Sequence, residues 1–247
     1  MLIPIKTMTL AYGIRPTNVA HVGAHHAEEF KDYKKYGWGK VLWIEAIVEN
    51  IKVIQQVISG SQDEIVNAAI WSSSGNLLNF NIASNSQSTS ALPFAYHSVL
   101  YPDIVKTGDR KIVSITLDEL LRTKEIPNFI NLDIQGSELE ALKGLSNSLY
   151  AVKWIYTEVN KQELYESCPL VYEIDEFLKP YGFFRFKTRW VLNHGWGDAL
   201  YVKNRPPKFK LKSLGYRFLD WSMWVLSQNI YRLKLVIHRC LEKAKSD

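Results

Sequence analysis

The stretch TNVAHVGAH at residues 17–25 begins as a short apolar run and ends in Gly23, Ala24 and a histidine. This pattern is typical of a buried strand that leads into a tight turn, because glycine adopts backbone conformations that other residues avoid. A helix is predicted after the turn at residues 28–36, and a second buried strand, KVLWIE, at residues 40–45. A strand, a helix and a strand in this order indicate one unit of a parallel sheet.

The alternation of strands and helices continues over the rest of the chain. Runs of Val, Ile and Leu with little polar alternation suit a parallel sheet that is covered on both faces. Further strands are predicted at 64–70, 77–82, 111–115, 128–133 and 151–158, helices at 48–58, from Ser137 and at 171–178, and a closing antiparallel pair of strands at 183–187 and 199–202. The polar stretch 84–109 shows no period and is predicted to be a long loop, and Ser137 and Glu140 have the spacing of a helix capping box. The predicted fold is therefore α/β, with a mostly parallel, doubly wound sheet and an antiparallel last strand.

The composition indicates a folded globular chain with one large core, since 47% of its 247 residues are hydrophobic and 22% are charged. The two cysteines, Cys168 and Cys240, show neither metal nor redox spacing and form no disulfide framework. Residues 1–13 lack the basic region and the apolar run of a signal peptide. These observations favour a reducing compartment, and the expected location is the cytoplasm.

The net charge of +5 is unevenly distributed along the chain. Residues 203–247 hold 11 Lys or Arg and 3 Asp or Glu, a balance of +8, so the other residues together carry −3. The basic character therefore belongs to the end of the chain and not to the predicted α/β domain. Nucleic acid is not an expected partner, because a protein that binds it carries the basic face on its binding domain.

Pro206 and Pro207 separate the predicted domain, residues 1–203, from a basic extension at residues 204–247. A helix with one apolar stripe is predicted there, from about residue 214 to about residue 243. Its uncharged run of 11 residues, 221–231, is too short to span a bilayer, which needs about 20 residues. Three interpretations stay open: the helix packs on its own domain or on a second copy in a homo-oligomer, it lies peripherally on the inner membrane surface, or it docks a partner enzyme.

Ligands of open α/β sheets bind outside the carboxyl ends of the strands, so the residues at the predicted strand tips form the candidate site. Gly23 would let the backbone approach a ligand closely. Glu45 follows the second strand, where a carboxylate could accept hydrogen bonds from both hydroxyls of a ribose. The candidate cofactor-binding residues are Val22, Gly23, Ala24, His25, Glu45, Ala46, Ala69, Asp133 and Gln135.

The pattern of motifs argues against two common nucleotide-binding classes. Ala27 stands where a dinucleotide-binding GxGxxG motif has its third glycine, and no GxxxxGK[ST] phosphate-binding loop occurs. Asp133, at the tip of the fourth strand beside Gln135 and Gly136, could hold a methionine ammonium or face a methyl acceptor. Hydride-transfer enzymes have no such requirement at this position, so Asp133 favours methyl transfer.

Six motifs occur in order between residues 17 and 203 of the chain. They are HVGAH at 21–25 with Glu28 and Glu29, WIEA at 43–46, TLD at 116–118, LDIQGSE at 132–138 with LKG at 142–144, EVN at 158–160 with Leu164 and Tyr165, and GWGDALY at 195–201. With these motifs the chain resembles the FkbM-type methyltransferases. The resemblance implies a Rossmann-like class I fold, S-adenosylmethionine as the cofactor, and O-methylation of a hydroxyl on a sugar, glycan, polyketide or other small-molecule acceptor. The chain departs from many class I enzymes at His21, where they have an acidic residue, and at Ala27, where they have glycine.

Methyl transfer to a hydroxyl calls for a base that takes the hydroxyl proton, because a protonated alcohol is a poor nucleophile. The candidate catalytic residues are Asp133, His194 and Glu158, with Asp198 as a further candidate base. Asp133 has the best position, and cofactor binding is its alternative role. His194 stands in a predicted loop, and histidine is the residue type best suited to exchange protons near neutral pH. Asp133, Glu158 and Asn160 could instead bind a divalent cation, although no metal is favoured.

Two other functions stay open. The first is an N-methyltransferase of RNA or protein, which is less favoured because residues 133–136 read DIQG where such enzymes have Asn or Asp followed by Pro-Pro and an aromatic residue. The second is a non-catalytic scaffold that keeps the fold and recruits partners through residues 204–247. His25 and His26 are interpreted as turn residues, because no third metal ligand is spaced near them.

Overall fold

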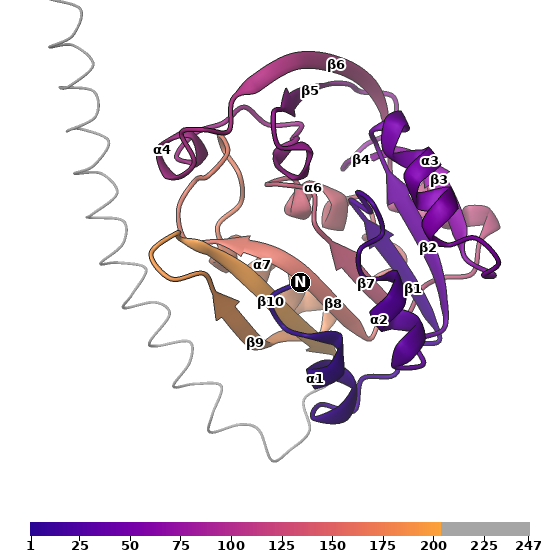
Figure 1. Cartoon of the computed structure of the whole chain (residues 1–247). Coiled ribbons are helices and arrows are strands. Elements are labelled where there is room, and N and C mark those ends of the chain that lie inside the picture. Colours follow the sequence, from indigo (N-terminus) through magenta and orange to yellow (C-terminus); the bar gives the residue numbers. More distant parts are fainter. Residues whose placement is uncertain (204–247) are drawn as a thin grey trace, which may run out of the picture. The chain divides into compact units, whose positions relative to one another are not determined.

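A seven-stranded sheet forms the centre of residues 1–203, the part of the chain that this computed structural model describes (Figure 1). Its strands lie in the order β3-β2-β1-β7-β8-β10-β9. Their bounds are Asn18–Val22 for β1, Lys40–Glu45 for β2, Glu64–Asn67 for β3, Phe129–Leu132 for β7, Trp154–Asn160 for β8, Phe183–Trp190 for β9 and Trp196–Lys203 for β10. The first five of these strands in the sheet are parallel, whereas β10 pairs antiparallel with both β8 and β9. The predicted doubly wound, mostly parallel sheet with an antiparallel last strand is confirmed.

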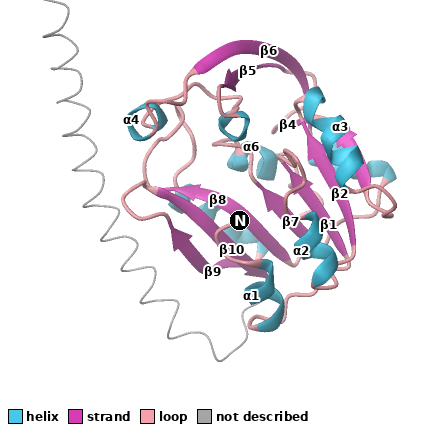
Figure 2. Ribbon diagram, viewed as in Figure 1, coloured by secondary structure: helices cyan, strands magenta, loops and turns pink. Residues whose placement is uncertain are grey.

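Helices cover both faces of the large sheet (Figure 2). One face packs against α1 (Ile5–Leu10), α2 (Phe30–Lys35) and α3 (Val48–Val57), and the other against α5 (Leu117–Leu120), α6 (Glu138–Lys143) and α7 (Val171–Leu178). Because successive side chains of a strand point to opposite faces, Phe129 of β7 packs with the first group and Ile130 with the second. The helices predicted at 48–58 and 171–178 are confirmed, whereas α1 has no counterpart in the prediction.

The predicted extension at 204–247, its helix and the three interpretations of that helix lie outside the described residues. Within residues 1–203, no helix combines the length and the apolar character that a bilayer crossing requires. The short 3-10 helices of this part are η1 (Ser86–Ser88), η2 (Leu121–Thr123) and η3 (Lys179–Tyr181).

A smaller sheet with the strand order β4-β6-β5 extends from the large one (Figure 1). In it, β6 (Lys106–Ile115) pairs in parallel with β4 (Ala69–Ile70) and antiparallel with β5 (Leu77–Ala83). The single strand predicted at 64–70 is therefore wrong, because the chain leaves the large sheet after Asn67.

The long loop predicted at 84–109 is also wrong. The segment contains η1, the helix α4 (His97–Leu100) and the first residues of β6. None of residues 106–110 is buried, so this part of β6 has no apolar face and leaves no period in the sequence.

The start of α6 differs from the prediction in its capping. The Ser137 side chain makes no capping hydrogen bond, and Glu140 pairs with Lys143 (2.6 Å), so the predicted capping box is wrong. Glu138 turns inward instead, and its Oε1 accepts the backbone N–H groups of Ile134 (3.1 Å) and Gly136 (3.2 Å). The turn between β7 and α6 is thus held by a fully buried carboxylate.

The tips of β1 and β7 approach each other so closely that only glycine fits at position 23. Gly23 has a positive φ of 80°, and a Cβ atom there would lie 1.8 Å from the carbonyl oxygen of Asp133. Gly23 donates its own N–H to the carbonyl oxygen of Ile44 at the end of β2 (2.9 Å), and Asp133 donates to that of Val22 (3.0 Å). This glycine therefore joins the ends of three strands.

We expect Gly23→Ala to destabilise the fold more than an alanine at a glycine that has the same backbone conformation and free space. Gly60 is the matched control, with a φ of 78° and no other atom within 4 Å of the position that a Cβ atom would take. Gly60→Ala should lower the free energy of unfolding by about 1–2 kcal/mol through its left-handed backbone. Gly23→Ala should lose a further 1–3 kcal/mol or so through overpacking. Urea denaturation followed by circular dichroism measures both, and equal losses would contradict the close approach.

Candidate active site

A cavity of about 530 Å³ opens at the carboxyl ends of the parallel strands. The turns after β1, β2 and β7, the ends of β8 and β10, and the segment 85–104 line it. The predicted site residues that line it are Val22, Gly23, Ala24, His25, Glu45, Ala46, Asp133, Gln135, Glu158 and Asp198. Its volume lies in the range of sites for cofactors and small molecules.

Glu45 joins the turns after β1 and β2. Its Oε2 accepts the backbone N–H of His25 (2.8 Å), and its Oε1 accepts that of Ile47 (2.7 Å). The side chain is buried, and burial raises the pKa of this carboxyl. Because an ionised carboxylate offers about four acceptor positions, Glu45 can still accept hydrogen bonds from a ligand in the cavity.

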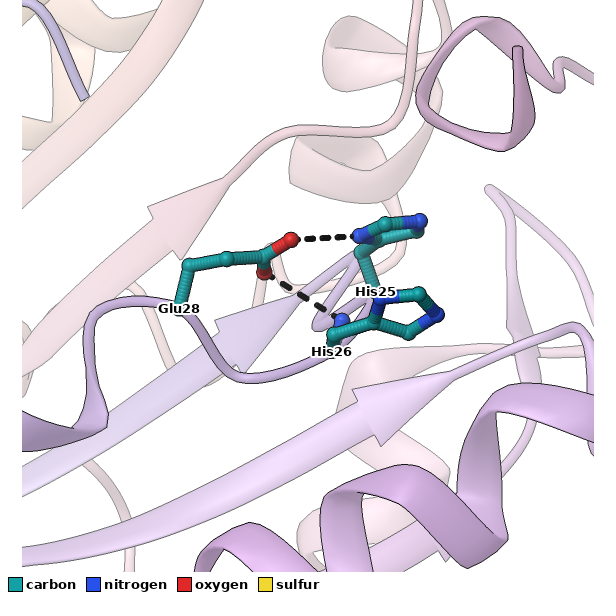
Figure 3. A group of neighbouring side chains, drawn as sticks. All are labelled: His25, His26 and Glu28. Atoms are coloured by element: carbon teal, nitrogen blue, oxygen red, sulfur yellow. Dashed lines mark hydrogen bonds and ion pairs between the residues drawn. The ribbon is translucent and has the colours of Figure 1, made fainter.

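His25, His26 and Glu28 form a compact group in the turn after β1 (Figure 3). The Glu28 Oε1 lies 2.6 Å from the Nδ1 of His25, and its Oε2 accepts the backbone N–H of His26 (3.2 Å). Burial opposes ionisation of Glu28, but the hydrogen bonds to His25 and to backbone N–H groups outweigh it and lower its pKa to about 2.

The reason given for treating the two histidines as turn residues is therefore wrong, because Glu28 lies close enough to be a third ligand. Two observations nevertheless favour a structural role. Both ring nitrogens of His25 are engaged, Nδ1 by Glu28 and Nε2 by the Ser86 hydroxyl at 2.8 Å. The two imidazole rings also stack on each other, with their centroids 3.8 Å apart.

Gln135 connects the two carboxylates at the tips of β7 and β8. Its Nε2 donates to Asp133 Oδ1 (2.8 Å) and to Glu158 Oε2 (3.2 Å). Its Oε1 accepts the hydroxyl of Tyr165 (2.6 Å), which turns the NH₂ group toward the two acids. The Ser90 hydroxyl also donates to the Gln135 carbonyl oxygen (2.6 Å), so residue 135 is fixed from both sides.

Burial raises the pKa of three carboxyl groups in this region, those of Glu158, Glu138 and Asp198. It raises the pKa of Glu158 well above its usual value, and the nearby Glu138 and Asp133 carboxylates raise it further. It raises the pKa of Glu138 to about 7 and that of Asp198 to about 6. Asp198 accepts the backbone N–H of Leu2 (2.6 Å) and the hydroxyl of Tyr156.

His21, where the chain departs from many class I enzymes, lines the cavity as a buried side chain. Burial lowers its pKa, which favours the neutral imidazole. Its ring contacts the Asn131 amide (3.1 Å) and the Tyr33 hydroxyl (3.3 Å). A neutral, hydrogen-bonded histidine thus stands at this position.

Three predicted residues lie away from the cavity. Ala69 is not part of its lining, although its neighbours Ala68 and Ile70 are, because alternate residues of a strand point in opposite directions. His194 is also outside the lining. Its Nδ1 lies 2.6 Å from the Leu192 carbonyl oxygen.

Asn160, the third, is buried outside the lining, and neither atom of its amide has a hydrogen-bond partner. The cation site considered for Asp133, Glu158 and Asn160 is therefore not assembled, because the Gln135 amide stands between the two carboxylates.

Sequence reasoning missed the positions of several residues in and around the site, among them Glu138 and Ser137. Glu138 belongs to the LDIQGSE motif, but a glutamate in the first turn of a helix normally faces solvent near the positive end of the helix dipole. Ser137 lines the cavity with a buried hydroxyl that has no hydrogen-bond partner, where the spacing to Glu140 indicated a cap. Only the motif as a whole could have singled them out.

Residues 20–185 match the family model described as the methyltransferase FkbM domain. The match covers more than half of the chain, so this chain belongs to the FkbM methyltransferase family. The resemblance drawn from the six motifs is confirmed, and the sheet described above is the Rossmann-like sheet of a class I methyltransferase.

Individual relatives are similar over shorter stretches or at low identity. A segment of 55 residues is 38% identical to the hexuronic acid methyltransferase AglP of Haloferax volcanii, and it spans only 22% of this chain and 23% of that protein. The magnesium protoporphyrin IX methyltransferase ChlM of Synechocystis PCC 6803 is 9% identical, with a TM-score of 0.49 over 81% of this chain and 76% of its own. A SAM-dependent methyltransferase of Aquifex aeolicus is 13% identical, with a TM-score of 0.40 over 81% of this chain and 89% of its own.

The buried Glu138 carboxyl should make the stability of the fold depend on pH. Its pKa is about 7 in the folded chain against an ordinary 4.5, so the folded state binds the proton more tightly than the unfolded state. The resulting stabilisation is present below the ordinary pKa and is lost as pH rises through 7. Glu138→Gln keeps the acceptor oxygen and removes the titration. As pH rises from about 5 to about 8, the natural chain should lose stability relative to the variant. The difference between their free energies of unfolding should shift by up to roughly 3 kcal/mol in favour of the variant.

Glu140→Gln, two residues further along α6, is the matched control. Burial raises the pKa of Glu140, but hydrogen bonds from Lys143 and Ser72 outweigh this and lower it. Its replacement should therefore give no such gain. Urea denaturation of the three proteins at several pH values measures the difference, and parallel curves for the natural chain and Glu138→Gln would refute the shift.

Proposed function

We propose that this methyltransferase transfers a methyl group from S-adenosylmethionine to a hydroxyl of a sugar or glycan acceptor. The observation that carries the proposal is the pair of carboxylates, Asp133 and Glu158, which Gln135 holds together at the cavity. The local match to a hexuronic acid methyltransferase supports a sugar as the acceptor.

The residues at the tips of β1 and β2 fit the cofactor. Gly23 leaves open the backbone space that a Cβ atom would fill, and Glu45 presents a buried carboxylate that two backbone N–H groups orient. Ile47, Ala68 and Phe80 add apolar surface to the same cavity, as an adenine ring requires. Val22, Gly23, Ala24, Glu45 and Ala46 would hold the cofactor, which when bound supplies a methyl group on a positively charged sulfur.

Asp133 is the base of the proposed reaction. Its carboxylate lines the mouth of an open cavity, and the surrounding protein atoms, which displace water from the carboxyl group, raise its pKa, although the hydrogen bond from Gln135 works against this shift. A carboxylate with a raised pKa accepts protons better near neutral pH. Gln135 occupies Oδ1 and leaves Oδ2 available, so this oxygen would take the proton of the acceptor hydroxyl.

Aromatic side chains that line the cavity fit the acceptor. Tyr101, Tyr165 and Trp196 line it, and the Trp196 Nε1 donates to the Tyr101 hydroxyl (2.9 Å), which fixes both rings. Rigid rings beside carboxylates form a surface that combines apolar contact with hydrogen-bond acceptors. A sugar offers the matching chemistry, because it carries C–H groups on its faces and hydroxyls on its edge.

Glu45→Gln should weaken cofactor binding, because a neutral amide replaces the charge-assisted hydrogen bonds to the ribose. We expect a loss of about 1.5–3 kcal/mol in binding free energy, measured by isothermal titration with S-adenosylmethionine. Glu49→Gln on α3 is the matched control, since Glu49 is exposed, pairs with Arg110 and lies outside the cavity lining. Unchanged affinity in a folded Glu45→Gln protein would remove Glu45 from the ribose site. No heat with the natural chain would favour the non-catalytic scaffold.

Asp133→Asn keeps the shape of the side chain and removes its charge. If Asp133 is the base, the methyl-transfer rate should fall about 10²–10⁴-fold, while cofactor affinity changes little. The assay follows labelled methyl groups from the cofactor to sugar acceptors, and the exposed Asp103→Asn is the control. A loss of affinity with a preserved rate at saturating cofactor would assign Asp133 to cofactor binding instead.

A further inference from the structure

The lining of the cavity is strongly acidic. Six carboxyl side chains face it, those of Glu28, Glu29, Glu45, Asp133, Glu158 and Asp198. Within residues 1–203, no lysine or arginine takes part in the lining. These carboxyl groups concern both ligands of the cavity, because charges in a protein cavity are screened less than charges in bulk water.

Three of these carboxylates already have partners that offset their charge. Glu28 pairs with His25 (2.6 Å), and Glu29 lies 3.5 Å from the ammonium group of Met1. Glu45 accepts two backbone N–H groups at the cofactor end.

The other three lie together and have neutral partners. Asp133 and Glu158 share the Gln135 amide, and Asp198 accepts the Leu2 N–H and the Tyr156 hydroxyl. None of the three forms an ion pair with another described residue. S-adenosylmethionine carries one net positive charge, which cannot neutralise all three carboxylates.

A second observation points to a ligand at the same end. The Ser137 side chain is only 3% exposed, lines the cavity and has no hydrogen-bond partner. Unpaired buried hydroxyls are rare, because they lose their bonds to water and gain nothing in exchange. A polar ligand beside Asp133 and Glu158 would supply the missing partner.

We infer that the acceptor carries an ammonium group and no carboxylate or phosphate, so that its class is an amino sugar or a glycan that ends in one. Three carboxyl groups that form no ion pair within residues 1–203 attract an ammonium group, and they repel an anionic sugar. This inference rests on the proposed sugar O-methylation and makes it narrower. It also separates this chain from AglP, whose name specifies a hexuronic acid.

The test compares three acceptors of equal size with the full chain: the methyl glycosides of glucosamine, glucose and glucuronic acid. Labelled methyl transfer should show a kcat/KM for the amine about 10-fold above that for glucose and at least about 100-fold above that for glucuronate. Binding titrations with the cofactor-free protein should give the same order of affinity. Use of glucuronate equal to or better than that of the amine overturns the inference.

Glu158→Gln tests whether the carboxylates cause the preference for the amine. The variant should lose most of the preference for the amine over glucose, through a higher KM for the amine and with a smaller change in kcat. The exposed Glu166→Gln, outside the cavity, should keep the preference. An unchanged preference in Glu158→Gln overturns the inference, and so does activity that a chelator abolishes and added magnesium restores.

The failure of the inference is distinguishable from that of the proposed function. If S-adenosylmethionine binds and only neutral or anionic sugars are methylated, the inference alone falls. If the cofactor binds and none of the three sugars is methylated, the sugar acceptor falls and the inference with it. If the cofactor does not bind, the proposed function falls first.

Discussion

The contact between the backbones at Gly23 and Asp133 is the constraint on which the site depends. The first turn of the sheet can lie against the tip of β7 because residue 23 has no side chain, and a Cβ atom would lie 1.8 Å from the Asp133 carbonyl oxygen. This contact places the loop that carries His25 beside the strand that carries Asp133. The neighbouring hydrogen bond from Gly23 to Ile44 adds the tip of β2, and so brings Glu45 to the same cavity.

Uncharged hydrogen-bond donors hold the side chains around Asp133 in place. Gln135 bonds to two carboxylates, Tyr165 orients Gln135, and two backbone N–H groups hold Glu138. Burial raises the pKa values of Glu138 and Glu158, and the hydrogen bonds from these neutral donors offset only part of the shift. The fold thus accepts an electrostatic cost at the site, which a bound cation would reduce.

Much of this arrangement follows from the sequence alone. The central strands β1, β2, β7 and β8 are largely buried on both faces, so their apolar runs predicted them. Glu45, Asp133 and Glu158 were predicted as site residues because they stand at or next to the ends of these strands. The start of β6 escaped prediction because residues 106–110 have no buried face. Glu138 escaped because its burial depends on the turn between β7 and α6, and Tyr165 because its contact with Gln135 joins residues 30 positions apart. The local sequence pattern indicates which residues are apolar. These contacts depend instead on how the turns and the segments far apart in the sequence pack together.

The segment that carries η1 has a consequence for the rate at which ligands exchange. Two serines fasten it to opposite sides of the cavity, Ser86 at the ring of His25 (2.8 Å) and Ser90 at the carbonyl oxygen of Gln135 (2.6 Å). Movement of this segment away from the cavity would break both bonds. Opening of a loop can limit turnover in enzymes as readily as bond making does.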